Sequence, residues 1–508
     1  MLNKIKLLLI AITAMILLVA CGEKSEEGSK VKKDTLTVAQ PADAKALDPH
    51  ATNDQPSARV MTQIYDRLAE IDNDMNIIPG LAESWEQPDS FTTIFNLRHG
   101  IKFHNGEELK ASDVKFSLER ELKTATVSHI VEGIDKVEVL DDYTVKVTTT
   151  DPCGAILYNL AHPASSILNE KSVTKSGKNY GQEPIGTGPY KFVSWDAGDK
   201  ITLEANSEYF NETPAIKNLV FRNIVEGSNR VIGLETGEID IAYDIEPIDS
   251  ERVATHDDLK FTQQEAPSLD YIGFNMKKKP FDNKKVRQAI ATAVNVDDLI
   301  EAVLMGAGTK ANSPIGPKVF GYNPNAKAYK FNVEKAKQLL TEAGYPSGFE
   351  TVIWTNDNPI RMQVCQIVQA QLKEIGIEMR IEPMEWGAYL ESTARGEHDM
   401  YILGWGTTTG DADYGLYALF HSSTQGGPGN RSFYKNPAVD NLLDKGKSST
   451  NPEERKALYG EAQEIIQEDL PVLSLFYKNI NAGMQNNVEG FVLHPSGSHR
   501  LVTAHFAE

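Results

Sequence analysis

The expected secondary structure changes in kind near residue 270, and this change limits the possible folds more than any other feature. Before it, alternating apolar and polar residues predict strands paired in hairpins, one over residues 134–150 and one over residues 190–205. After it, helices with clear capping residues alternate with short strands. A mixed first half followed by an α/β second half predicts two lobes, each with its own core. The length of 508 residues agrees with this prediction, because one core rarely serves more than about 300 residues.

Several individual elements follow from local patterns. Apolar spacing predicts a strand over residues 35–39 and a helix over residues 57–71, and Ser112 is expected to cap a further helix. In the second half the expected helix caps are Asn332, Asn358 and Asn451. Short strands are expected there over residues 377–382, 399–405 and 472–477.

The N-terminus has the layout of a signal peptide over residues 1–20. Two lysines precede an apolar stretch over residues 7–20, which is short for a membrane span. The tripeptide Leu-Val-Ala then precedes Cys21 and resembles the lipobox of bacterial lipoproteins, in which the cysteine is lipidated. An ordinary secretory signal with a chance cysteine is the alternative. Residues 21–34 are charged and suit a flexible tether, so we expect an extracytoplasmic protein that a lipid anchors to the cell membrane.

Composition excludes several classes of protein. Hydrophobic residues make up 41% of the chain and charged residues 24%, which argues against disorder and against a polytopic membrane protein. The net charge of −20 argues against a nucleic-acid partner, because phosphate backbones would be repelled. Beyond the lipobox only Cys153 and Cys365 remain, and we interpret both as buried thiols rather than a bridge or a metal site.

The sequence contains no recognisable catalytic motif. There is no nucleophile elbow, no H-E-x-x-H and no phosphate-binding Gly-Lys loop. The eleven histidines are scattered, and the three in the C-terminal tail, at 494, 499 and 505, fit no standard metal spacing. We therefore expect a binding protein with no cofactor and no metal site; a secreted hydrolase is the alternative from another class.

Longer motifs, taken together, resemble the family 5 solute-binding proteins of peptide/nickel-type ABC importers. The likeness extends over residues 36–501. Its motifs occur in the family's order: ALDPH near residue 50, then the stretches at residues 80–120, 184–192, 274–290 and 332–346.

The resemblance implies an α/β fold, a periplasmic-binding-protein type II-like clamshell of two lobes with an extra subdomain in lobe I. Carried onto this chain, lobe I would span residues 35–270, including an inserted subdomain at about 56–184. Lobe II would span residues 271–474, and residues 475–508 would return to lobe I. A small peptide would bind in the cleft, ABC permease subunits would be the partners, and the protein would be a monomer.

Two segments, residues 159–164 and 404–422, resemble most the glutathione-binding branch of this family. Dipeptide- and oligopeptide-binding members commonly place an Asp three residues after a loop Trp, where it receives the peptide's α-ammonium group. This chain has Thr408 at that position. The departure favours a ligand whose amino group lies elsewhere, as in a γ-glutamyl peptide.

Arg361 is the expected ligand-carboxylate site. It stands at the third position of the helix that Asn358 caps, where free backbone N–H groups and the positive helix end also attract anions. The same residue resembles the carboxylate-binding Arg of dipeptide-binding relatives. A surface Arg near a helix start is the alternative.

The loop after the strand at residues 399–405 is expected to hold the rest of the ligand. Its candidate residues are Trp405, Thr407, Thr408, Thr409, Asp411 and Asp413. The Trp suits ligand packing or an inter-lobe core, and the three Thr suit hydrogen bonding or an extended strand. We prefer Asp411 as the acceptor for a ligand ammonium group, because Asp413 could simply cap the next helix.

These observations predict a substrate-binding lipoprotein that captures glutathione or a related thiol or thioether peptide and delivers it to a permease. A general di- or oligopeptide receptor and a nickel or nickel-chelate receptor are the alternatives that share the fold.

Overall fold

A sheet of twelve strands runs through the computed structural model, which describes residues 33–427 and 429–507. The strand order is β16-β15-β17-β13-β18-β11-β1-β10-β9-β8, and β12 and β14 also pair with β18. The strands are β1 (Thr35–Gln40), β8 (Tyr190–Asp196), β9 (Lys200–Ala205), β10 (Asn218–Asn223), β11 (Ile241–Tyr243), β12 (Leu259–Glu265), β13 (Ser268–Phe274), β14 (Gly308–Lys310), β15 (Phe349–Asn356), β16 (Ile377–Met384), β17 (Met400–Gly406) and β18 (Val472–Gln485).

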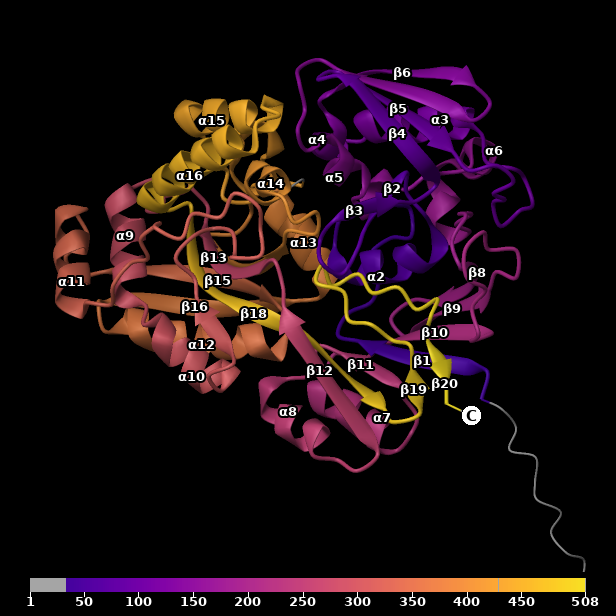
Figure 1. The fold of residues 1–508 in the computed structure, drawn as a ribbon. Helices are drawn as coiled ribbons and strands as arrows, with labels where there is room; N and C mark the ends of the chain where they lie inside the picture. Colours follow the sequence, from indigo (N-terminus) through magenta and orange to yellow (C-terminus); the bar gives the residue numbers. More distant parts are fainter. Residues whose placement is uncertain (1–32, 428, 508) are drawn as a thin grey trace, which may run out of the picture. The chain divides into compact units, whose positions relative to one another are not determined.

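The long strand β18 lies in the middle of this sheet and joins its two halves (Figure 1). Its beginning pairs with β13 and β14, whereas its end pairs with β11 and β12. The two ends of β18 also belong to different hydrophobic clusters. Tyr477 packs in a cluster with residues of β13 and β17, and Ala482 packs in a cluster with residues of β1 and β10. We call residues 268–477 the second part, and residues 35–265 together with 480–507 the first part.

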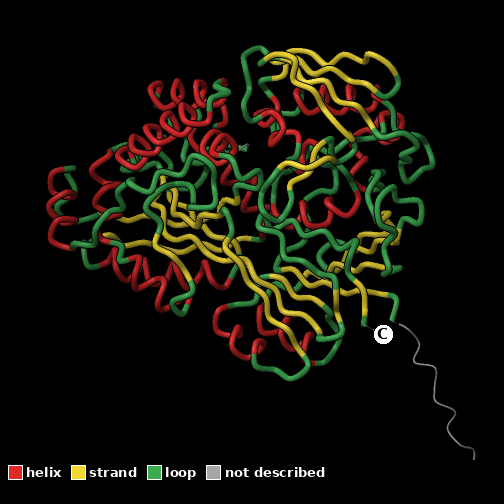
Figure 2. Tube along the Cα trace, in the orientation of Figure 1, coloured by secondary structure: helices red, strands yellow, loops and turns green. Residues whose placement is uncertain are grey.

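The second part has helices on both faces of its strands (Figure 2). In β17, Met400 and Ile402 enter the cluster beneath one group of helices, and Tyr401 and Leu403 enter the cluster beneath the other. The first group is α9 (Lys284–Ala293), α10 (Val296–Leu304), α11 (Val333–Glu342) and α12 (Pro359–Lys373). The second is α13 (Trp386–Ala394), α14 (Ala418–Phe420), α15 (Pro437–Ser448) and α16 (Pro452–Asp469). Burial on both faces explains why β17 begins with a continuous apolar run at residues 400–403.

The first part contains a separate four-stranded sheet in the order β4-β5-β7-β6. These strands are β4 (Ala82–Asp89), β5 (Thr92–Leu97), β6 (Ile134–Asp141) and β7 (Thr144–Thr149). They pack against α3 (Ala111–Leu122), α4 (Ser128–Val131) and α5 (Ile156–Leu160). The remaining elements are α2 (Gln55–Ile64), β2 (Ala69–Ile71), β3 (Ile77–Pro79), α6 (Glu170–Ser176), α7 (Gly227–Glu235), α8 (Pro247–Ala254), β19 (Val488–Glu489) and β20 (His505–Phe506).

Most local predictions are confirmed. Both predicted hairpins form, as β6–β7 and β8–β9. Asn332, Asn358 and Asn451 cap α11, α12 and α16 with side-chain hydrogen bonds. Both Cys153 and Cys365 are buried free thiols.

Two local predictions are wrong. The helix expected over residues 57–71 ends at Ile64, and Ala69–Ile71 is a strand. The carbonyl of Ile64 accepts instead from the N–H of Gly188, and that of Arg67 from the N–H of Leu81, so bonds to distant segments replace the helical ones. Ser112 is not a cap, because α3 begins one residue earlier and Lys110 precedes it.

The predicted signal peptide, most of the tether and the lipidation site Cys21 lie outside the described residues. Within residues 33–427 and 429–507, no helix has the length and apolar character needed to span a membrane.

Candidate functional site

The loop that follows β17 turns sharply and leads into a π-helix. The strand ends at Gly406, so the alternative in which the three Thr extend it is not observed. The N–H of Gly410 donates to the carbonyl of Thr407 at 2.8 Å, and residues 413–417 form one turn of π-helix. π-Helical turns are rare and frequently occur at functional sites.

Asp411 is held by an arginine far away in the sequence. Its two carboxylate oxygens accept from Arg455 Nη1 and Nη2 at 2.9 and 2.7 Å, and both side chains are almost fully buried. Oδ1 also accepts from the N–H of Asp413 at 2.9 Å. Because these bonds already satisfy Asp411, its geometry favours a structural role, which revises our preference for it as the ammonium acceptor.

Asp413 has the unsatisfied carboxylate of this loop. Its Oδ2 accepts from Asn159 Nδ2 at 3.2 Å, whereas Oδ1 is buried without a hydrogen-bond partner among the described residues. Ala412, not Asp413, holds the cap position of the π-helix, so the capping alternative is not observed. Burial raises the pKa of Asp413. A buried carboxylate oxygen with no partner is costly, and a donor from a ligand would relieve that cost.

Trp405 lies between the two parts of the molecule. It is half-buried and packs against the cluster of the four-stranded sheet as well as against a cluster of the second part. Its ring centroid lies 5.3 Å from that of Tyr414, which in turn lies 4.6 Å from His162 of the first part. The indole Nε1 is buried and has no hydrogen-bond acceptor among the described residues. Trp405 can therefore offer both a ring face and an N–H donor.

The three threonines have different environments. Thr407 and Thr409 are buried, and the hydroxyl of Thr409 accepts from the N–H of Asp411 at 3.3 Å. Thr408 is half-buried. Burial raises the pKa of Tyr414, and the nearby hydroxyl of Thr408 acts in the opposite direction. Although Thr408 is the least buried residue of the three, its hydroxyl oxygen is buried and has no hydrogen-bond partner among the described residues.

Arg361 carries a positive charge with no direct ion pair among the described residues, although the carboxylate of Asp270 lies nearby. The guanidinium is half-buried and Nη1 donates to Asn356 Oδ1 at 2.9 Å, but Arg361 forms no ion pair with any described residue. A Cβ atom at residue 404 would lie 3.2 Å from Arg361 Nη2 and 3.2 Å from Asp270 Oδ1, so Gly404 leaves room for the guanidinium and for a carboxylate close to it. Asn358 accepts from the N–H of Arg361, as the cap prediction requires. An unpaired guanidinium at a helix start is well suited to a carboxylate.

The family of bacterial extracellular solute-binding proteins, family 5, matches residues 76–427 of this chain. The chain belongs to this family. The glutathione-binding protein GsiB of Pectobacterium atrosepticum is 35% identical over 467 residues, which cover 89% of this chain and 90% of that protein.

Solved structures give the same assignment for this family 5 protein. The periplasmic binding protein DppA of Helicobacter pylori, in complex with the peptide STSA, has a TM-score of 0.89 and 33% identity and covers 94% of this chain and 99% of its own. NikZ of Campylobacter jejuni, in complex with Ni(L-His), has a TM-score of 0.83 and 26% identity. The match covers 91% of this chain and 96% of the NikZ chain. The predicted type II periplasmic-binding-protein fold is confirmed. The chain is an extracytoplasmic receptor of an ABC importer of the peptide/nickel type, and it is not an enzyme.

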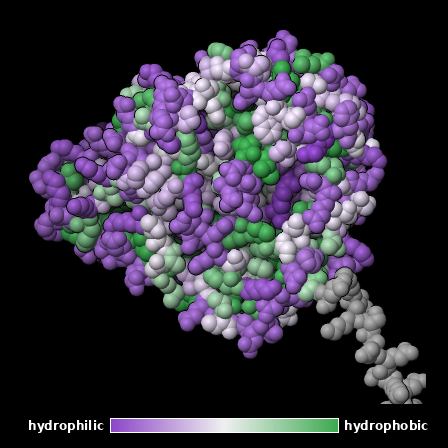
Figure 3. Space-filling model, in the orientation of Figure 1, coloured by the Kyte–Doolittle hydropathy of each residue, from purple (hydrophilic) through white to green (hydrophobic). Residues whose placement is uncertain are grey.

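Contacts between the two parts surround the loop of this solute-binding protein. Lys447 Nζ lies 3.2 Å from Glu132 Oε1 and 4.3 Å from the centroid of the Tyr417 ring. Burial lowers the pKa of Lys447, but the charges of Asp413 and Glu132 outweigh burial and raise it. In the space-filling view, apolar patches show along the middle of the face, where the two parts meet (Figure 3). Sequence reasoning missed Asn159, Lys447 and Tyr414 as contributors to this interface.

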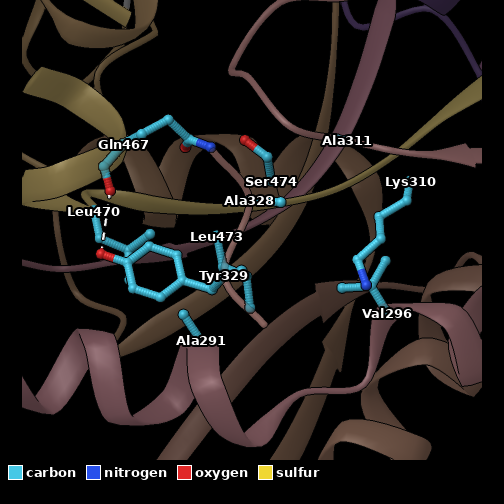
Figure 4. Close-up of a pocket in the computed structure, with 10 residues that line it drawn as sticks. All are labelled: Ala291, Val296, Lys310, Ala311, Ala328, Tyr329, Gln467, Leu470, Leu473 and Ser474. Atoms are coloured by element: carbon cyan, nitrogen blue, oxygen red, sulfur yellow. Dashed lines mark hydrogen bonds between the residues drawn. The ribbon is translucent and has the colours of Figure 1, made fainter. Parts of the chain in front are cut away.

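A pocket elsewhere in the second part is too small for a peptide. It lies between α9, α10, β14 and β18, and the Tyr329 hydroxyl on its wall donates to the carbonyl of Gln467 at 3.3 Å (Figure 4). It has room for roughly one water molecule. The candidate ligand site is therefore the interface near Trp405 and Arg361, not this pocket.

A buried carboxyl group in the first part supports the Asn159 side of the site. Glu121 of α3 is fully buried, and its Oε1 accepts from Ser165 Oγ at 3.0 Å, while Oε2 has no hydrogen-bond partner among the described residues. Ser165 Oγ also lies 3.0 Å from the carbonyl oxygen of Asn159. Burial raises the pKa of Glu121 to about 8.

Glu121 should make the stability of the protein fall as pH rises. Between the pKa of about 4.5 in the unfolded chain and about 8 in the folded protein, only the folded state keeps the proton, so unfolding becomes easier with rising pH. Relative to Glu121→Gln, the wild type should therefore lose on the order of 5 kcal/mol of unfolding free energy across this range. Urea unfolding of both proteins at several pH values measures the difference. A pH-independent difference would contradict this expectation.

Proposed function

We propose that this protein captures glutathione, or a related thiol or thioether peptide, and delivers it to its permease. The support comes from two groups of opposite charge beside the loop after β17. Arg361 forms no ion pair among the described residues, and one oxygen of Asp413 is buried without a partner there. A zwitterionic peptide supplies a carboxylate for Arg361 and an ammonium donor for the free oxygen of Asp413, whose charge also interacts with Lys447.

Three further residues complete the proposed site. Trp405 offers its ring face and indole N–H, while Thr407 and Thr409 shape the turn that presents Thr408. A hydroxyl at residue 408 does not supply the negative charge that the α-ammonium group of an ordinary dipeptide requires at this position. This argues for a γ-glutamyl peptide over an ordinary dipeptide, in agreement with the likeness to a glutathione-binding protein. Asp411 serves the site by fixing the loop through Arg455.

The proposal includes the arrangement of the whole chain. Residues 35–270 with 475–508 form lobe I, which includes an inserted subdomain at about 56–184, and residues 271–474 form lobe II. The lobes close on the ligand by a hinge motion, as the fold class does. The mature protein is a monomer, and a lipid on Cys21 anchors it to the membrane.

Thermal unfolding with a panel of ligands tests the proposal. Glutathione, the dipeptide Met-Leu and nickel with histidine are each added to separate samples of the purified protein. Glutathione at about 100 times its dissociation constant should add roughly 2.7 kcal/mol to the stability of the folded state. Mass spectrometry of the same protein identifies any co-purified ligand and weighs the peptide that contains Cys21.

The outcomes separate the candidates. Stabilisation by Met-Leu alone would make the protein a general peptide receptor, and stabilisation only by nickel with histidine would make it a nickel-chelate receptor. Either result would overturn the glutathione assignment while leaving the family intact. An unmodified Cys21 peptide would overturn the lipid anchor.

A further inference from the structure

Trp386 contacts both Arg361 and the first part of the molecule. It is the first residue of α13, and its ring centroid lies 5.7 Å from the Arg361 guanidinium carbon. Its indole Nε1 donates to Asp54 Oδ2 at 3.2 Å. Asp54 caps α2 in the first part, so this bond crosses the interface. One side chain thus links the proposed carboxylate site to the opposite face.

Asp54 is a well-fixed acceptor. Its Oδ1 accepts from Thr52 Oγ1 at 2.7 Å, and Oδ2 also accepts from the N–H of Ser57 at 3.4 Å as the cap of α2. These bonds lie within the first part and do not depend on the second. The next residue, Gln55, also reaches the interface, because its Oε1 would lie 3.8 Å from a Cβ atom at Gly406.

We infer that Trp386 is a positioning residue that couples closure of the two parts to the orientation of Arg361. When the parts meet, Asp54 fixes the indole, and the indole ring covers one side of the guanidinium. When they separate, the bond to Asp54 breaks and the ring no longer has a fixed orientation. The carboxylate site is then complete only in the closed protein. This inference rests on the proposed role of Arg361 in binding a ligand carboxylate.

Stopped-flow kinetics with glutathione test the inference on the full-length protein. Trp386→Phe keeps an aromatic ring beside Arg361 but removes the N–H donor together with one ring of the indole. The dissociation rate constant should rise about tenfold, because without its hydrogen bond to Asp54 the aromatic ring no longer holds the Arg361 guanidinium in place. The association rate constant should change less than about twofold, since encounter precedes closure.

Trp195→Phe is the matched control. Trp195 Nε1 donates to Asp43 Oδ2 at 3.1 Å, but both residues lie within the first part. This variant loses the same kind of bond away from the interface, so both rate constants should stay within about twofold of wild type. Asp54→Asn is a second test variant, because Asn still caps a helix but offers a neutral acceptor. It should raise the dissociation rate constant in the same direction.

A double-variant cycle separates positioning from a general structural effect. If Trp386 acts through Arg361, then Trp386→Phe should have little further effect on affinity in the Arg361→Ala background. Full additivity of the two changes, or dissociation from Trp386→Phe that matches the wild type, would overturn the inference. A wild-type protein that does not bind glutathione at all would instead overturn the proposed function.

Discussion

Replacing Arg361 with alanine should raise the dissociation constant for glutathione by a factor of about 30 to 5,000. Loss of one member of a charged, hydrogen-bonded pair at a binding interface costs about 2–5 kcal/mol. Arg361 is half-buried, donates to Asn356, and forms no direct ion pair with Asp270 or any other described residue. The ligand carboxylate would therefore be the partner whose loss is measured. Titration calorimetry gives the affinity directly.

Two further variants make the result for Arg361 specific. Arg395→Ala removes an exposed arginine of the second part whose Nε lies 2.6 Å from Glu397 Oε1, and it should leave the affinity unchanged. Arg361→Lys should fall between wild type and alanine, because lysine keeps the charge but not the planar, bidentate geometry. If Arg361→Ala binds glutathione as tightly as Arg395→Ala does, Arg361 is not the carboxylate site.

Local patterns predicted much of the fold because the physical cause is local. The hairpin turns and the asparagine caps each depend on residues a few positions apart. The helix over residues 57–71 was predicted wrongly for the opposite reason. Beyond Ile64 its carbonyls bond to segments more than ten residues away, such as Gly188, and no local pattern signals that competition.

In the candidate site, too, the residues with a local signal could be predicted and those with distant partners could not. Arg361 could be chosen from sequence, since a cation at the start of a helix capped by Asn358 is locally unfavourable. The roles of Asp411 and Asp413 could not be told apart, because Arg455 lies 44 residues after the one and Asn159 lies 254 residues before the other. One signal in the sequence could have indicated the Asp411 pair. Arg455 lies on the buried face of α16 with Tyr459 and Ala462, and a buried charge needs a partner of opposite charge.

Replacing Arg455 with methionine should lower the free energy of unfolding by about 3–5 kcal/mol, since it leaves the buried carboxylate of Asp411 unpaired. Arg455 also donates to the carbonyl of Gly446 at 2.9 Å, so the variant loosens the end of α15 as well. Thermal and urea unfolding of the ligand-free protein measure the loss.

Lys456→Ala is the neighbouring control for Arg455 on the same helix. Lys456 Nζ lies 2.9 Å from Glu453 Oε1, but both side chains are exposed, so its loss should cost less than about 1 kcal/mol. Adding Asp411→Asn to Arg455→Met should recover part of the stability, because the amide removes the unpaired charge and can still accept from the N–H of Asp413. If the double variant is less stable than Arg455→Met alone, the pair does not act as a charge pair. The double variant could also regain stability but still bind glutathione weakly. That result would show that the bidentate pair shapes the ligand loop in addition to neutralising a buried charge.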